Sequence, residues 1–191
     1  MHCIVGLGNP EPRYSLTRHN SGFQIADALA AHINSMYTHG SGEYLYAKGM
    51  LQGSPVLILK PLTYMNHSGI AVAQVMRFYR IPLEHLLVVY DDLDLPFGTF
   101  RIRMHGSDGG NRGMRSIIQE IGSEEFTRFR FGIRNREIIA NPSSYVLSPF
   151  TKKEQKVLPQ LLGRAAEAIT ISVAYGIETT MNRFNKNHLG E

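Results

Sequence analysis

The chain has 191 residues, of which 43% are hydrophobic and 19% are charged. These proportions predict one globular domain with an apolar core, and they exclude a disordered chain. The net charge is +4, which permits an anionic partner. Its meaning depends on where the excess lies along the chain.

The single cysteine, Cys3, excludes an intrachain disulfide and fits a reducing compartment. It lies in a short apolar run, so we expect a small buried side chain rather than a reactive thiol. No segment approaches the about 20 apolar residues that a membrane span needs. The N-terminal residues lack the pattern of a signal peptide. We therefore expect a cytoplasmic protein.

Strand and helix patterns alternate along the chain. The predicted strands are short runs between turn residues, at 2–7, 44–50, 56–60, 86–90, 97–104 and 128–133. Apolar residues at helical spacing predict the helices, at 23–33, 68–79, 113–121 and 151–185. The turn at 53–55 predicts a hairpin. The last helix should start at a capping box, Thr151 to Glu154, and break at Pro159 and Gly176.

This alternation predicts an α/β fold, with residues 1–191 forming a single three-layer domain. Helices should flank a twisted, mixed and mostly parallel sheet, in which the continuously apolar run 86–90 is a central parallel strand. Such sheets bind ligands beyond the C-terminal ends of their strands. Polar residues gather after three of the predicted strands, so a site is expected at that edge.

The first polar segment runs from Gly6 to Asn20. Its Gly-x-Gly start suggests a dinucleotide site, but the third glycine is absent and Pro10 stands where a helix should begin. No Gly-Lys-Ser/Thr follows, which excludes a P-loop. The segment therefore offers Asn9 and His19 as polar groups, unless Asn9 only caps a turn and His19 only lies on the surface.

The second and third segments carry an amide and three carboxylates. Asn66 could cap the following helix or hold a substrate carbonyl. Asp91, Asp92 and Asp94 could bind a divalent metal, form a solvated turn, or supply one carboxylate that orients a catalytic histidine. The spacing of histidines and cysteines does not fit a zinc site.

The fourth segment combines Arg101 and Arg103, which share one face of a strand, with a glycine-rich turn before a helix. Guanidinium groups and free backbone N–H groups suit phosphate. The alternative is a basic solvent face and a flexible turn. The charge distribution favours phosphate binding by this segment. Residues 101–136 hold 8 basic and 4 acidic side chains and so carry the whole excess of +4.

Together and in order, these segments resemble the bacterial-type peptidyl-tRNA hydrolases. The matching pieces are IVGLGNP, TRHNSGF, KPLTYMNHSG, VVYDDLDLPFG, RSIIQEIG after a glycine-rich turn, and FRFGI. The resemblance implies a monomeric enzyme with a phosphorylase/hydrolase-like fold and no cofactor or metal. It implies hydrolysis of the ester between a peptide and the 3′ ribose of tRNA, which recycles tRNA from aborted translation.

The resemblance also implies roles for individual residues. His19 matches the family's catalytic base, Asp91 its aspartate partner, and Asn9 the asparagine tied to the blocked N-terminal residue. The positions implied to contact substrate or tRNA are Tyr14, Tyr64, Asn66, Arg103 and Arg130.

One position departs from the family pattern. The common turn reads GGHNG, whereas this chain has Gly109-Gly110-Asn111-Arg112-Gly113. Arg112 stands where the family has an asparagine, and an arginine cannot accept a hydrogen bond. Either Asn111 takes over through a shifted backbone, or Arg112 acts differently, for example on phosphate.

The predicted mechanism is attack by a water molecule that His19 deprotonates, with Asp91 orienting the ring and Asn9 and Asn66 holding carbonyl oxygens. Two other classes stay open. One is a non-catalytic RNA-binding relative, such as the organellar splicing factors built on this fold. The other is a metal-dependent phosphoesterase that uses the three aspartates.

Overall fold

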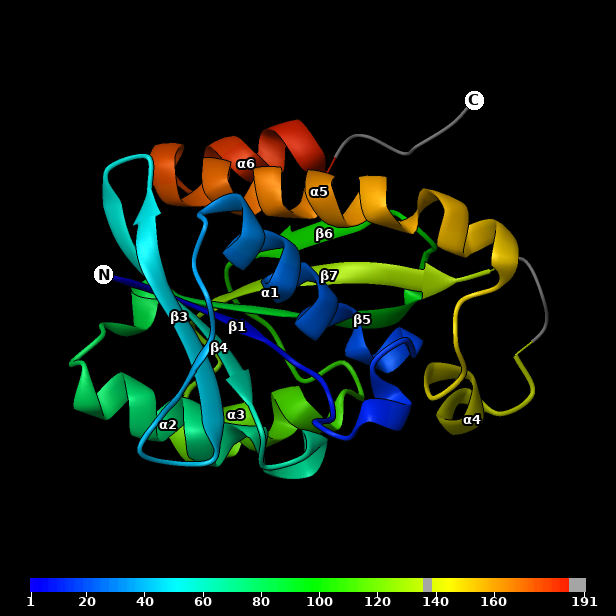
Figure 1. Cartoon of the computed structure of the whole chain (residues 1–191), viewed down its shortest axis with the longest axis horizontal. Helices are drawn as coiled ribbons and strands as arrows, with labels where there is room; N and C mark the ends of the chain where they lie inside the picture. The colour runs from blue at the N-terminus through cyan, green and yellow to red at the C-terminus, as the bar shows by residue number, and fades with distance from the viewer. Residues whose placement is uncertain (136–138, 186–191) are drawn as a thin grey trace.

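The computed structural model describes residues 1–135 and 139–185. Its strands form one seven-stranded sheet in the order β2-β3-β4-β1-β5-β7-β6 (Figure 1). The four central strands, β4, β1, β5 and β7, are parallel, and the outer strands pair antiparallel. The strand bounds are β1 His2–Gly6, β2 Thr38–His39, β3 Tyr44–Leu51, β4 Ser54–Pro61, β5 Leu86–Pro96, β6 Phe100–Arg103 and β7 Thr127–Arg134.

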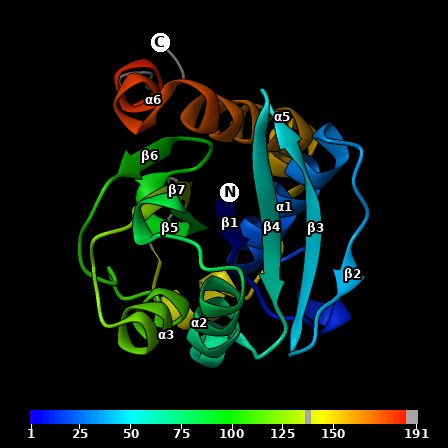
Figure 2. The same cartoon turned by 90° about the vertical axis from the view of Figure 1, so that its left-hand side faces the viewer.

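Helices cover both faces of the sheet. Figures 1 and 2 show α1, α5 and α6 on one face, and α2 and α3 on the other. The predicted mixed α/β sheet between helical layers is therefore confirmed. The α-helices are α1 Ser21–His32, α2 Ser68–Phe78, α3 Arg112–Ile121, α4 Pro142–Val146, α5 Lys152–Tyr175 and α6 Ile177–Phe184. Short 3-10 turns include η1 Pro12–Tyr14, η2 Arg18–Asn20 and η3 Met65–His67.

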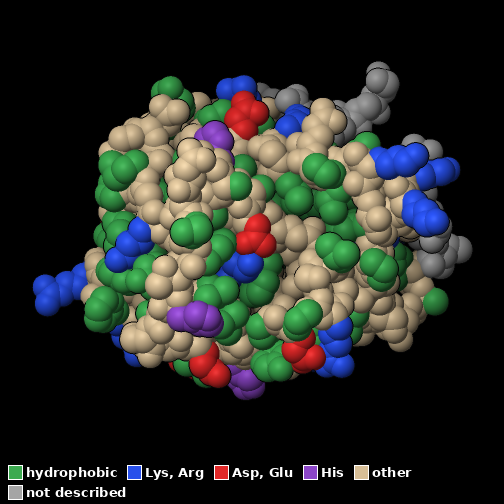
Figure 3. All heavy atoms as spheres, viewed as in Figure 1, with side chains coloured by type: hydrophobic (Ala, Val, Ile, Leu, Met, Phe, Trp, Pro, Cys, Tyr) green, Lys and Arg blue, Asp and Glu red, His purple; other side chains and the backbone are tan. Residues whose placement is uncertain are grey.

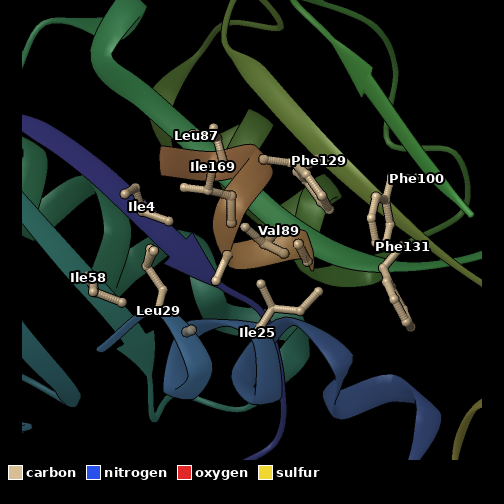
Figure 4. Close-up of a cluster of buried hydrophobic side chains, with 14 of the residues drawn as sticks. Ile4, Ile25, Leu29, Ile58, Leu87, Val89, Phe100, Phe129, Phe131 and Ile169 are labelled. Carbon is tan, nitrogen blue, oxygen red and sulfur yellow. The ribbon is translucent and has the colours of Figure 1, made fainter. Parts of the chain in front are cut away.

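Each face of the sheet has its own apolar core. Ile4 of β1 packs with Leu29 of α1 and Ile169 of α5 (Figure 4), whereas its neighbour Val5 belongs to the cluster under α2 and α3. Successive side chains of a strand point to opposite faces, so a strand covered on both faces is apolar throughout. Cys3 is fully buried, as expected, and burial raises the pKa of its thiol to about 12.

The glycines at and just after the end of β1 allow close packing against α1. A Cβ on Gly6 would lie 2.3 Å from the carbonyl oxygen of Gly22, and one on Gly8 would lie 2.6 Å from the ring of Phe23. Both contacts are far shorter than atoms tolerate, so glycine is needed for α1 to approach β1 this closely. This contact accounts for the Gly-x-Gly pattern without a nucleotide.

Two predicted boundaries are wrong near the site. The central strand continues past Tyr90 to Pro96, because Asp91 and Asp92 pair with Phe131 and Gly132 of β7. The aspartates therefore lie on a strand, where successive side chains diverge, and not in a turn. The next strand starts three residues later than predicted, since a turn with Gly98 at φ +80° precedes β6.

The predicted break at Pro159 is also wrong. The capping box at Thr151 forms as predicted, and α5 then continues through exposed Pro159 to Tyr175. An internal proline costs a helix about 3 kcal/mol. Burial of the α5 residues that face the sheet offsets that cost, among them Leu161, Ala165 and Ile169. The predicted break at Gly176 is confirmed, with φ at +88°.

Candidate active site

A cleft of about 720 Å³ opens at the C-terminal ends of the central strands. The loops after β1 and β4, the end of β5, the turn before α3 and the α4 segment all contribute to its walls. Eight of the ten predicted site residues line it, and only Arg103 and Arg130 do not. The eight are Asn9, Tyr14, His19, Tyr64, Asn66, Asp91, Asn111 and Arg112.

His19 and Asp91 form a hydrogen-bonded pair in this cleft. His19 Nδ1 lies 2.8 Å from Asp91 Oδ1, and the two side chains are 14% and 4% exposed. η2 presents the histidine, and β5 holds the carboxylate in the middle of the sheet. Because Nδ1 faces the carboxylate, Nε2 is the nitrogen that remains to accept a proton.

Three influences set the pKa of His19. Burial lowers the pKa, the charge and hydrogen bond of Asp91 raise it, and the positive charge of Arg112 lowers it. The net pKa is raised above the ordinary value of 6.5. The ring is therefore a stronger base than a free imidazole, and its protonated form is stabilised.

The side chain of Asn9 is held in one orientation. Its Oδ1 accepts a hydrogen bond of 3.1 Å from the backbone N–H of Met65. The side chain of Asn20 brackets the Asn9 backbone with two hydrogen bonds of 2.9 Å, one to its N–H and one to its carbonyl. The Nδ2 group of Asn9 has no hydrogen-bond partner among residues 1–135 and 139–185. It is therefore free to donate to a substrate carbonyl.

Tyr64 and Asn66 line the cleft from the turn whose central residue, Met65, contacts Asn9. Tyr64 is 49% exposed and has φ +57°, an unfavourable value for a residue with a Cβ. Such strain persists where the surroundings enforce it, often at functional sites. Asn66 is exposed, and no described residue hydrogen-bonds its side chain. The alternative that it caps α2 is wrong, because His67 occupies that position.

Asn111 occupies the N-cap position of α3, at the end of the unusual turn. Its Oδ1 accepts from the N–H groups of Gly113 and Met114 and so caps α3. Its Nδ2 donates to Asp91 Oδ1 across 3.2 Å. The amide thus both accepts and donates, while Arg112, the first residue of α3, extends exposed into the cleft.

Asp92 has separate partners. Its Oδ2 contacts Arg130 Nε, and its Oδ1 accepts a hydrogen bond of 2.8 Å from the backbone N–H of Asp94. The two neighbouring carboxylates thus have different surroundings, one a histidine and the other an arginine. No group of three or more potential metal ligands of the His, Cys, Asp or Glu type occurs in the described part of the chain.

The arginines of residues 101–136 are not all available to an anionic partner, because some of them are buried or paired with other groups. Arg128 is 2% exposed and donates to backbone carbonyls of the glycine-rich turn, including that of Ser107 at 3.0 Å. Arg115 pairs with Asp108 at 2.8 Å. Arg103 is exposed at the edge of the sheet, outside the cleft. On the face seen in Figure 3, basic side chains lie in separate groups and form no continuous band.

Sequence reasoning missed two contributors to the site. Asn20 orients Asn9, and Arg18 lies buried beside His19. Asn20 and Arg18 flank the predicted base, so their position was the available signal.

Among the described helices, none is both long and apolar enough to cross a membrane.

A histidine–carboxylate pair at the C-terminal edge of a mixed sheet, in a cleft also lined by the amide of Asn9, is typical of an α/β enzyme of the hydrolase type. The sequence profile described as peptidyl-tRNA hydrolase matches residues 3–191. The chain belongs to the peptidyl-tRNA hydrolase family.

Named relatives and a solved structure agree with this membership. The peptidyl-tRNA hydrolases of Chlorobaculum parvum and Carboxydothermus hydrogenoformans are 46% and 47% identical to the chain, over 97% of it and 98% and 99% of their own lengths. The crystal structure of peptidyl-tRNA hydrolase from Acinetobacter baumannii matches with a TM-score of 0.90 at 32% identity. That match covers 97% of this chain and 95% of the other.

Proposed function

We propose that the chain hydrolyses the ester between a peptide and the 3′ end of tRNA, with His19 as the general base for water. The observation that carries this proposal is the His19–Asp91 pair at 2.8 Å in a cleft that the side-chain amides of Asn9 and Asn66 also line. Membership of the family supplies the substrate class. The non-catalytic RNA-binding alternative is not favoured, because it would leave this pair without a use.

The chemistry needs no covalent intermediate. His19 Nε2 takes a proton from water as the water oxygen bonds to the ester carbonyl carbon. Asp91 stabilises the imidazolium that forms, through the Nδ1 hydrogen bond. The tetrahedral intermediate then expels the ribose 3′-oxygen, which receives the proton back from the imidazolium. The products are the free peptide acid and tRNA with a 3′-hydroxyl.

The amide groups stabilise the carbonyl oxygen as its charge develops. Asn9 lines the cleft and is held in place by the Met65 and Asn20 contacts. Asn66 lines the same cleft. One donor aimed at an oxyanion lowers a barrier by about 3–4 kcal/mol. Because Asn9 is fixed by other groups before substrate arrives, its donor costs little reorganisation.

The remaining rim residues contact the rest of the substrate. Tyr14 and Tyr64 offer aromatic faces to a base or a peptide side chain. Arg112 and Arg103 have no ion pair with described residues, which leaves them available to phosphates. Arg130 reaches phosphate only by sharing its guanidinium with Asp92. We further propose a cytoplasmic monomer in which residues 1–191 act as one domain without a metal or cofactor.

The proposal is tested with N-acetyl-aminoacyl-tRNA and with the unblocked aminoacyl-tRNA as control. We expect the purified protein to release the amino acid from the blocked substrate much faster than from the free one. The rate should be the same with and without a chelator. Absence of release would overturn the hydrolase assignment. Loss of release with chelator would overturn the metal-independent mechanism.

A further inference from the structure

Arg18 is a buried charge directly beside the proposed base. It is the first residue of η2, immediately before His19, and is 2% exposed. A buried guanidinium is costly unless charge and hydrogen bonds compensate it. Its partners therefore show which parts of the fold it holds together.

These partners lie about 130 residues further along the chain. Arg18 Nη2 pairs with Glu154 Oε2 at 2.7 Å, and Nη1 donates to Ser148 Oγ at 2.9 Å. Nη1 also donates to the carbonyl of Pro149. In addition, the backbone N–H of Arg18 donates to the carbonyl of Ser148 at 3.1 Å. Both the side chain and the backbone thus hold the segment between α4 and α5.

The same guanidinium packs against aromatic rings of this segment. Its carbon lies 4.4 Å from the ring centre of Tyr145 and 5.2 Å from that of Phe150. The hydroxyl of Tyr145 in turn donates to the carbonyl of Ile133, at the end of β7, at 2.7 Å. The segment 142–150 is therefore fixed at two places, by β7 and by Arg18.

This segment forms one wall of the cleft. Pro142, Val146 and Leu147 line it, and Leu147 is 41% exposed although its neighbours anchor to Arg18. The residue that fixes the wall thus stands next in sequence to the residue that performs the proposed chemistry. A change at the anchor would displace the apolar surface that faces the substrate.

We propose that Arg18 is a positioning residue. Its buried ion pair with Glu154 fixes the position of the segment 142–150 relative to His19 and so sets the affinity for substrate. The inference rests on the proposed function for its kinetic part. Arg18 reaches no reacting atom, because its guanidinium points away into the 148–154 segment. Its loss should therefore weaken binding of the ground state and transition state alike.

The obvious variant, Arg18→Met, leaves Glu154 buried without a partner and can simply unfold the protein. The double variant Arg18→Met/Glu154→Gln removes both charges. The glutamine retains a side-chain oxygen that can accept from the backbone N–H of Thr151, and the backbone N–H at position 154 still donates to Thr151 Oγ1, so the capping box is kept. Arg183→Met is the matched control, since Arg183 pairs with Glu167 on exposed surface between α5 and α6.

Steady-state kinetics on N-acetyl-aminoacyl-tRNA and amide hydrogen exchange are measured on the wild type, the double variant and the Arg183→Met control. In the double variant we expect KM to rise about tenfold and kcat to change less than about threefold. The midpoint of the rising limb of the pH–rate profile should not move. Exchange across 142–150 should accelerate, and exchange in α3 should not. The control should match the wild type.

An unchanged KM together with unchanged exchange would overturn the proposal. A fall in kcat with a shifted midpoint of the pH–rate profile would also overturn the proposal. Arg18 would then act through His19 rather than through the segment 142–150. The exchange comparison does not depend on which reaction the cleft performs. Failure of the proposed function would appear separately, as a wild-type protein that releases no amino acid.

Discussion

Asn111 donates a 3.2 Å hydrogen bond to Asp91 Oδ1, the same oxygen that lies 2.8 Å from His19 Nδ1. One carboxylate oxygen therefore receives both the proposed base and the residue that caps α3. This arrangement ties the orientation of Asp91 to the start of a helix.

Two substitutions of Asn111 separate its two contacts. Asn111→Ser retains a good helix cap but loses the donor to Asp91, so we expect similar stability in urea unfolding and a several-fold lower kcat/KM. Asn111→Asp retains the cap and places a second carboxylate near His19, which should raise the pKa of the ring further. The rising limb of the pH–rate profile should then move to higher pH. An unmoved limb in Asn111→Asp would contradict the role assigned to this contact.

Arg112 opposes Asp91 in its effect on the base. Its positive charge lowers the pKa of His19, so Arg112→Met should raise that pKa and move the rising limb to higher pH. Loss of a phosphate contact should also reduce the salt dependence of tRNA binding by about one unit of slope. Arg115→Met, on the same helix but paired with Asp108, is the control. Equal effects of the two substitutions would remove Arg112 from the site.

The two neighbouring aspartates should behave differently. Asp91→Asn removes the charge that raises the pKa of His19, so the rising limb should move to lower pH while the plateau falls, on the order of 10²-fold. Asp92→Asn should change the rate little, because Asp92 contacts Arg130 and the Asp94 backbone instead. If Asp92→Asn proves the more damaging change in single-turnover assays, the wrong carboxylate has been assigned.

The sequence predicts the architecture well because its signals are local. Apolar strands such as 2–7, the hairpin at 53–55 and the Thr151 capping box each specify their own geometry. The extension of β5 to Pro96 could not be predicted, because pairing with β7 overrides two aspartates that favour a turn. The continuation of α5 through Pro159 likewise depends on packing against the sheet, which no local pattern contains.

The site residues likewise fall into those that local sequence patterns predict and those that they do not. His19, Asn9 and Asp91 can be proposed from motifs, since each is a polar residue that follows an apolar run in the sequence. The partners of Arg18, Arg128 and Arg130 cannot be predicted in this way, because they lie far away in the sequence. Arg128 is buried against backbone carbonyls and Arg130 faces Asp92, so a count of basic residues overstates the charge available to tRNA. Arg18 binds a segment about 130 residues away, which is equally invisible to local patterns.

The central claim is that His19 activates water in this cleft. Its most direct test is single-turnover release of the acyl group from N-acetyl-aminoacyl-tRNA, with saturating enzyme, by wild type and His19→Ala across a range of pH. The wild-type rate should rise through a midpoint above pH 6.5, because the pKa of His19 is raised. His19→Ala should be slower by about 10²–10⁴-fold and lose that limb. A His19→Ala variant with a near wild-type rate and an unchanged pH profile would contradict the account.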